Sequence, residues 1–151
     1  MPDSSQALRV AALRLLTQRD HSRAELERKL ADKAESAEQL ESVLERLQSE
    51  RLLSDHRFAS QRAASRGVRY GNARLKQELR QQGVSDEDIS AALPEAGDEV
   101  ARCLAVWRRK FSDLPKTAEE RAKQMRFLQY RGFSGDAIQR VFRQSTHGAE
   151  E

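Results

Sequence analysis

The stretch Ala122–Phe142, AKQMRFLQYRGFSGDAIQRVF, predicts two short helices joined by a tight turn at residues 131–134. Gly132 is expected to adopt the left-handed conformation that often ends a helix, because glycine has no Cβ to clash there. Ser134 follows as the cap of the second helix, where its hydroxyl accepts a bond from a backbone N–H group.

The same pattern occurs twice more in the chain. Gly83 precedes Gly132 by 49 residues, and the serine caps and apolar positions repeat at that interval. The equivalent positions are Leu30, Leu79 and Leu128; Leu40, Ile89 and Ile138; Leu44, Leu93 and Phe142; and Ser36, Ser85 and Ser134. A fixed period of this length is typical of stacked helical repeats.

The fold class follows from these repeats. We predict an all-α protein, with three tandem three-helix repeats forming an elongated, curved array. The predicted segments are repeat 1 at 6–53, repeat 2 at 54–96, repeat 3 at 97–143, and a polar tail at 144–151. Residues 1–5 and the tail are expected to be frayed, because they are polar and lie at the chain ends.

Local signals predict where the helices begin. Capping boxes, in which a serine or threonine pairs with a glutamate or glutamine three residues later, are expected at Ser22, Ser36 and Thr117. Asn72, which follows the loop between Gly67 and Gly71, is expected to cap the next helix.

Composition limits the classes of protein. Of the 151 residues, 38% are hydrophobic and 5% aromatic, which favours a thin core in each repeat over one thick core. Cys103 is the only cysteine, so it can form neither an internal disulfide nor a cysteine-based metal site, and we expect a small core residue. No signal peptide or membrane span is evident, so we expect a cytoplasmic protein.

Charge is distributed unevenly along the chain. Residues 25–50 contain eight acidic and four basic side chains, whereas residues 57–80 contain seven basic side chains and one acidic residue, Glu78. Residues 102–131 contain nine basic and three acidic side chains. Such asymmetry indicates a polyanionic or acidic partner for the middle and the end of the chain.

Candidate partner-binding residues lie in the two basic stretches. Arginine forks can grip phosphates or carboxylates with two hydrogen bonds, and the two tyrosines stand beside arginines. An ordinary solvated helix surface is the alternative interpretation. The candidates are Arg66, Arg69, Tyr70, Arg74, Lys76, Arg80, Arg108, Arg109, Lys110, Lys123, Arg126, Tyr130 and Arg131.

The aromatic residues and the histidines give no indication of a catalytic site. Phe127 and Phe133 are expected in the core rather than at a base-stacking surface. The three histidines, His21, His56 and His147, share no helical face, so we expect no metal site, no catalytic residues and no cofactor.

Several motifs occur together in this chain: SRAEL at 22–26, LSD at 53–55 with RFA at 57–59, YGNARL at 70–75, and FLQYRGFS at 127–134. Together they resemble the RecX family, the bacterial regulators of the RecA recombinase. Ser54 replaces the first of two aspartates usual in the family, and Asn72 replaces a usual proline. The resemblance implies a protein that binds the RecA–DNA filament and modulates, most often inhibits, strand exchange, ATP hydrolysis and coprotease activity.

Three functions follow as alternatives. The first is a non-enzymatic, monomeric regulator that binds RecA and the single- or double-stranded DNA in its filament groove. The second is a stand-alone DNA-binding protein with helix-turn-helix-like repeats, although no helix combines Asn, Gln and Arg on a face suited to reading bases. The third is a nuclease, but this sequence lacks the acidic or histidine cluster that such an enzyme needs.

Overall fold

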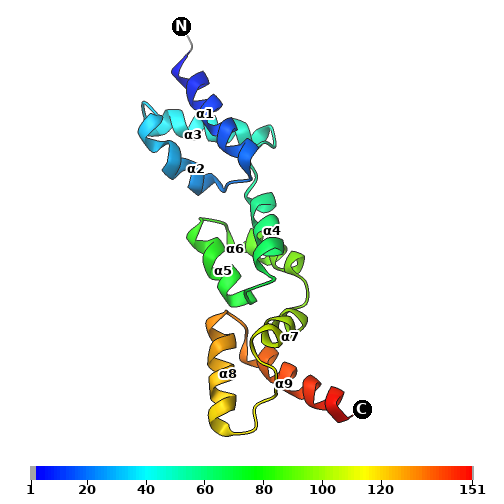
Figure 1. Ribbon diagram of the computed structural model, residues 1–151. Coiled ribbons are helices and arrows are strands. Elements are labelled where there is room, and N and C mark those ends of the chain that lie inside the picture. The colour runs from blue at the N-terminus through cyan, green and yellow to red at the C-terminus, as the bar shows by residue number, and fades with distance from the viewer. Residues whose placement is uncertain (1–2, 151) are drawn as a thin grey trace. The chain divides into compact units, whose positions relative to one another are not determined.

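The computed structural model describes residues 3–150, with side chains described for residues 3–144, and over this range the fold is entirely helical (Figure 1). Within residues 3–150, nine α-helices and two short 3₁₀ helices follow one another: α1 Ser4–Gln18, α2 Arg23–Leu30, η1 Ala31–Lys33, α3 Ala37–Ser49, α4 Asp55–Arg66, α5 Asn72–Gln81, α6 Asp86–Ala92, η2 Leu93–Ala96, α7 Glu99–Lys110, α8 Ala118–Tyr130 and α9 Gly135–Glu150. The predicted all-α fold with three helices per repeat is confirmed. Its elongated, curved shape stays a prediction.

Contacts divide the chain into two compact units. Unit 1 comprises Met1–Ala59 and Leu79–Ile89, and unit 2 comprises Ser60–Glu78 and Ser90–Glu151. Helices α4, α5 and α6 therefore each contribute residues to both units. The repeat boundaries predicted from the sequence stay predictions.

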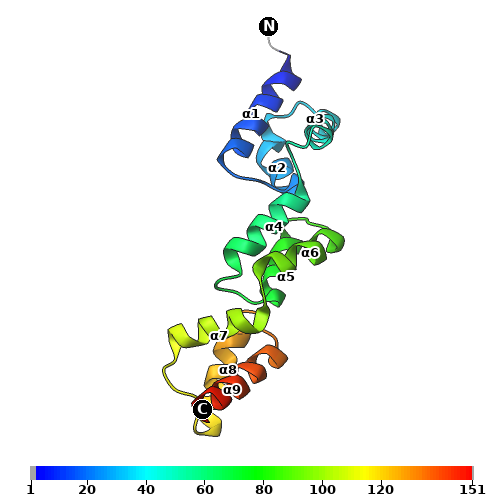
Figure 2. The ribbon, with the colours of Figure 1, turned by 90° about the vertical axis from the view of Figure 1, so that its right-hand side faces the viewer.

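The core of unit 1 lies among α1, α2 and α3, which pack together in both views (Figures 1 and 2). Each helix has one apolar stripe, and the three stripes meet. Leu26, Leu44 and Leu47 are fully buried there. Each such leucine stabilises the fold by about 2 kcal/mol relative to an exposed one.

The core of unit 2 lies among α7, α8 and α9. Leu128 and Ile138, two of the repeated positions, are fully buried beside Cys103. Trp107 donates its indole N–H to the side chain of the buried Gln124 at 2.7 Å. The core assignment of Cys103 is confirmed, and burial raises the pKa of its thiol to about 12.

Serine caps begin the third helix of every repeat, as predicted. The hydroxyls of Ser36, Ser85 and Ser134 each accept a bond of 3.1 Å from the backbone N–H group three residues later. The left-handed glycines are present in two repeats, with φ of 78° at Gly83 and 94° at Gly132. The first repeat has Ala34 at the equivalent position, and its backbone is extended.

Two of the three capping boxes differ from the prediction. Ser22 and Glu25 form the complete box. The other two are half boxes, because Gln39 and Glu120 accept bonds from the N–H groups of Glu35 and Lys116, each the residue before the cap.

The predicted cap at Asn72 is wrong. Asn72 is the first residue of α5, so Gly71 stands at the cap position. The Asn72 side-chain oxygen instead accepts a hydrogen bond from Arg102. A distant arginine therefore uses the oxygen that would otherwise cap the helix.

The ends of the chain are more helical than predicted. Helix α1 begins at Ser4, where the Asp3 carboxylate accepts a bond from the N–H group of Ser5. Helix α9 continues to Glu150, well into the predicted tail, because no proline or cap stops it. Residues 1–2 and 151 lie outside the described residues.

Candidate functional site

Two glycines bring distant parts of unit 2 into contact. Gly71 donates its N–H to the carbonyl of Arg131 at 2.9 Å, and Ala73 donates to the carbonyl of Gly132 at 3.2 Å. A Cβ on Gly71 would overlap the carbonyl of Gly132, and a Cβ on Gly132 would overlap Arg74. The turn before α5 therefore lies directly against the turn after α8.

A buried arginine fixes the loop at 67–72. The Arg102 guanidinium, on a residue that is only 8% exposed, donates to the carbonyls of Gly67 at 3.2 Å and Tyr70 at 2.7 Å. It also binds the side chain of Asn72. Burial lowers the pKa of Arg102, but its backbone partners replace the water that it loses.

Sequence reasoning counted Arg102 only as one more basic residue. The available signal was its place on α7, one residue before Cys103 and one turn before Val106, both of which are buried apolar positions. Glu99, on the same helix, was also missed. Its carboxylate accepts bonds from the N–H group of Asn72 at 2.8 Å and from the hydroxyl of Ser134 at 3.2 Å.

Three guanidinium groups surround one tyrosine ring. Those of Arg66, Arg74 and Arg131 lie 4.7, 4.3 and 5.5 Å from the centre of the Tyr70 ring. The Arg74 guanidinium also lies 5.8 Å from the centre of the Tyr130 ring. We call these five residues the arginine–tyrosine cluster.

The cluster lies beside further cations and exposed aromatic surface. Tyr130 is 77% exposed, which is unusual for so large a ring. The Arg131 guanidinium and the Lys110 ammonium lie 5.2 and 5.5 Å from the ring centre of Phe127. Phe127 is half-buried and Phe133 is buried, in agreement with their predicted core positions.

Glu78 is the carboxylate within this basic surface. Its two oxygens accept bonds from the Arg66 guanidinium at 2.6 and 2.8 Å, and Arg74 lies 3.6 Å from one of them. Partial burial acts to raise the pKa of Glu78, but the two arginines outweigh it and the pKa lies below its ordinary value. Glu78 is therefore ionised at neutral pH.

The structure brings six of the candidate residues together: Arg66, Tyr70, Arg74, Lys110, Tyr130 and Arg131. Arg109 donates to the carbonyl of Val68 at 2.9 Å, next to the loop that Arg102 holds. Arg80 belongs to unit 1, where its guanidinium pairs with Asp86 at 3.1 Å.

Five candidates remain exposed, and none forms a side-chain hydrogen bond, ion pair or ring contact with another described residue: Arg69, Lys76, Arg108, Lys123 and Arg126. Lys123, Arg126 and Tyr130 lie on one face of α8, because they are spaced three and four residues apart. Their cations are therefore available to a partner.

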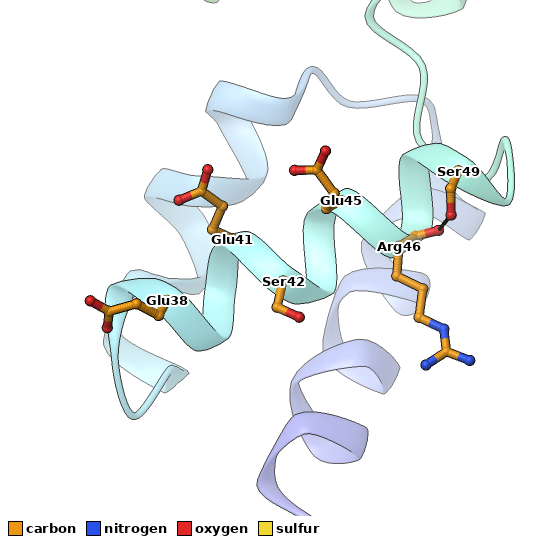
Figure 3. Close-up of a pocket in the computed structure, with 6 residues that line it drawn as sticks. All are labelled: Glu38, Glu41, Ser42, Glu45, Arg46 and Ser49. Carbon is orange, nitrogen blue, oxygen red and sulfur yellow. Dashed lines mark hydrogen bonds between the residues drawn. The ribbon is translucent and has the colours of Figure 1, made fainter.

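An acidic surface lies in unit 1. Glu41 and Glu45 point to the same side of α3, whereas Arg46 points to the other, around a shallow surface pocket (Figure 3). The Arg23 guanidinium lies 3.8 Å from Glu41 and 3.6 Å from Glu45. Part of the acidic stretch found in the sequence is thus a face of α3, on which Arg23 partly neutralises Glu41 and Glu45.

Within the described part of the chain, no group of three or more His, Cys, Asp or Glu side chains is placed to hold a metal ion. None of the helices there is both long and apolar enough to cross a membrane. The fold and the surface thus define a protein of tandem three-helix repeats with a cationic, tyrosine-bearing surface on unit 2.

Comparison with known proteins identifies the family. Models of the first, second and third three-helix domains of RecX match residues 9–47, 54–93 and 97–142. The chain therefore belongs to the RecX family.

Curated relatives support this assignment over nearly the whole chain. The "Regulatory protein RecX" of Pseudomonas fluorescens SBW25 is 47% identical over 145 residues, which cover 92% of this chain and 92% of that protein. The protein of the same name from Chromobacterium violaceum is 42% identical over 141 residues, or 93% and 92% of the two chains.

A solved structure shares the fold. The crystal structure of RecX from Lactobacillus salivarius aligns with a TM-score of 0.83 over 95% of this chain and 97% of that chain, at 20% sequence identity. A second crystal structure of a regulatory protein RecX gives a TM-score of 0.76 at 22% identity, over 92% of this chain and 73% of that chain.

Proposed function

We propose that this chain is a non-enzymatic regulator of RecA that binds the RecA–DNA filament through the arginine–tyrosine cluster and the exposed basic residues beside it. One observation carries the proposal. Arginines from two segments of unit 2, at residues 66–74 and at residue 131, meet around a single tyrosine ring. Membership in the RecX family is the reason for proposing RecA as the partner.

The chemistry of this surface suits a nucleoprotein filament. DNA phosphates and protein carboxylates both accept bidentate hydrogen bonds from guanidinium groups. Arg69 and Lys76 are exposed near the cluster in sequence, and Lys123 and Arg126 lie on the same helix face as Tyr130. Such cations would grip the DNA backbone and acidic patches of RecA together.

Regulation would follow from occupancy of the filament groove. A monomer lying there blocks the path by which duplex DNA, or a substrate of the coprotease activity, reaches the filament. It would thereby reduce strand exchange and ATP hydrolysis by RecA, in the cytoplasm where RecA acts. Binding alone is sufficient for this mechanism, so it needs no catalytic group and no cofactor.

Charge reversal tests the proposed surface. The variant R69E/R74E/K76E should lose filament binding and suppression of RecA ATP hydrolysis while it keeps its helicity. Because Arg74 also contacts Glu78 and Tyr70, the variant R69E/K76E, which changes only exposed side chains without partners, separates binding from folding.

A matched control is available in unit 1. The variant R14E/K33E makes the same change in net charge as R69E/K76E at two exposed side chains. It should inhibit strand exchange as well as the unaltered protein does. Inhibition that survives in the triple variant would place the binding surface elsewhere.

Stand-alone DNA binding is the second candidate function, and the exposure of Tyr130 beside Arg74 favours it, because unpaired bases stack on such rings. A salt titration separates the two functions. Tight, steeply salt-dependent binding to DNA of preferred sequence, in the absence of RecA, would favour the second. Binding that needs RecA, nucleotide and single-stranded DNA together would favour the first.

A further inference from the structure

The arginine–tyrosine cluster carries more positive charge than Glu78 can neutralise. Arg66, Arg74 and Arg131 contribute three positive charges against one carboxylate, and Glu78 uses both of its oxygens on Arg66. Arg131 instead donates to the carbonyl of Arg69 at 3.3 Å. Two of the three guanidiniums are therefore engaged by Glu78, and one is not.

The Arg66–Glu78 pair has the geometry with which an arginine holds a phosphate. The Nε and one terminal nitrogen of Arg66 each donate to a separate oxygen of Glu78. A phosphodiester offers two oxygens in a similar arrangement. A phosphate and the Glu78 carboxylate would therefore compete for the same two N–H groups.

We propose that Glu78 is a built-in competitor, an autoinhibitory contact that occupies Arg66 and Arg74 until the phosphate backbone of a nucleic acid displaces it. This inference rests on the proposed function, because it concerns the regulation of the same surface. Tyr130 and Arg131 make the first contact. Arg66 and Arg74 become available only when Glu78 turns away.

The surroundings of Glu78 permit this exchange. Its side chain is 24% exposed, so the carboxylate can reach water without unfolding of α5. The Arg66 and Arg74 side chains are about one-third exposed, at 33% and 32%. Because their guanidiniums rest on the Tyr70 ring, they keep their place when the carboxylate leaves.

The variant E78Q tests the competitor directly. Glutamine keeps the shape of the side chain but carries no charge, so the arginines lose their ionic partner. Affinity for a fluorescein-labelled oligothymidylate, measured by anisotropy, should rise about three- to fivefold, the range expected when a partly exposed ion pair is removed. The slope of log affinity against log salt should become steeper by about 0.7 for each arginine that is released.

E38Q is the matched control, since it removes one exposed carboxylate from unit 1, outside the proposed binding surface. It should leave the affinity and the salt slope nearly unchanged. In the R66Q background, E78Q should give a smaller gain, because only Arg74 is left to release.

Two results would overturn the inference. One is E78Q with native helicity and an oligothymidylate affinity no higher than that of the unaltered protein. The other is an equal gain from E38Q, because net charge alone would then explain the effect. If E78Q loses helicity, E78D takes its place, since its shorter side chain weakens the contact with Arg66 and affinity should still rise.

The same variants keep this inference distinct from the proposed function. Inhibition of RecA with unchanged oligothymidylate affinity in E78Q would reject the competitor and retain the regulator. Tighter oligothymidylate binding by E78Q, in a protein that has no effect on RecA, would retain the competitor and reject the regulator.

Discussion

The backbone N–H of Gly71 donates to the carbonyl of Arg131 at 2.9 Å, across sixty residues of chain. This bond joins the turn before α5 to the turn after α8. It places Tyr70, the residue before Gly71, next to the Arg131 side chain. The cluster in unit 2 therefore depends on a close approach that only glycine permits at these two turns.

Replacing Gly71 by alanine should destabilise the protein. The new methyl group would overlap the carbonyl of Gly132, and backbone must move to relieve the overlap. We expect a loss of about 2–4 kcal/mol in the free energy of unfolding, measured by urea denaturation. G135A is the control, because a Cβ there meets nothing within 4 Å and alanine favours the helix. A G71A variant as stable as G135A would contradict the contact.

Removing the Arg102 guanidinium should loosen the loop at 67–72. The variant R102M keeps an unbranched apolar stem but leaves the carbonyls of Gly67 and Tyr70 without their donor. We expect a loss of about 3 kcal/mol and faster hydrogen exchange at the amides of the loop and the start of α5. R108M, an exposed change on the same helix, should alter stability by about 0.5 kcal/mol at most.

Acidification should destabilise unit 1 through His21, which is 1% exposed. Its Nδ1–H donates to the carbonyl of Arg19 at 3.0 Å, which leaves Nε2 to accept from the Lys29 ammonium at 3.1 Å. Burial lowers the pKa of His21 below its ordinary 6.5, and the charges of Arg19 and Lys29 add to this against the pull of Glu25.

The sign of the pH effect follows from that direction. The folded protein keeps His21 neutral, so the stability that this neutral ring contributes is fully present above pH 6.5. That stability is lost as the pH falls below 6.5, because His21 then becomes protonated in the unfolded chain. The melting temperature should fall between about pH 7 and about pH 5.5, and H21Q should flatten this part of the profile. The pKa of Glu25 lies below its ordinary 4.5, so protonation of Glu25 changes the stability only in more acidic solution.

Cys103 should resist alkylation in the native protein. Its side chain is fully buried, and a thiol with a pKa of about 12 holds almost no thiolate at neutral pH. Iodoacetamide should react slowly without denaturant and quickly in urea. Modification of the folded protein at the rate of a free cysteine would show that the core around α7 opens readily.

Much of the fold could be predicted because its signals are local. The 49-residue interval links Ser36, Ser85 and Ser134, and each caps a helix by contact with an N–H group only three residues away. Leu30, Leu79 and Leu128 are buried at equivalent places because helical periodicity alone sets their face. Asn72 is an exception, because a partner thirty residues away decides where its side chain binds.

The candidate site could be predicted only as a list of basic residues and two tyrosines. Arg74 and Arg80 belong to the same basic stretch and the same helix, α5, yet Arg74 contacts Tyr70 and Glu78 whereas Arg80 pairs with Asp86 in the other unit. Arg102 lies in the same basic stretch as Arg108, yet one is buried and the other exposed. Charge along the chain does not distinguish them.

The sequence by itself determined the helices, the repeated serine caps and the threefold repetition, because these depend on residues within one or two turns of each other. Only the tertiary structure decided which arginines surround Tyr70, which of them Glu78 neutralises, and which lies buried as a support. Those outcomes depend on contacts between segments that are twelve residues apart for Arg66 and Glu78, 32 for Tyr70 and Arg102, and about sixty for Tyr70 and Arg131, and these contacts are set by packing rather than by any local pattern.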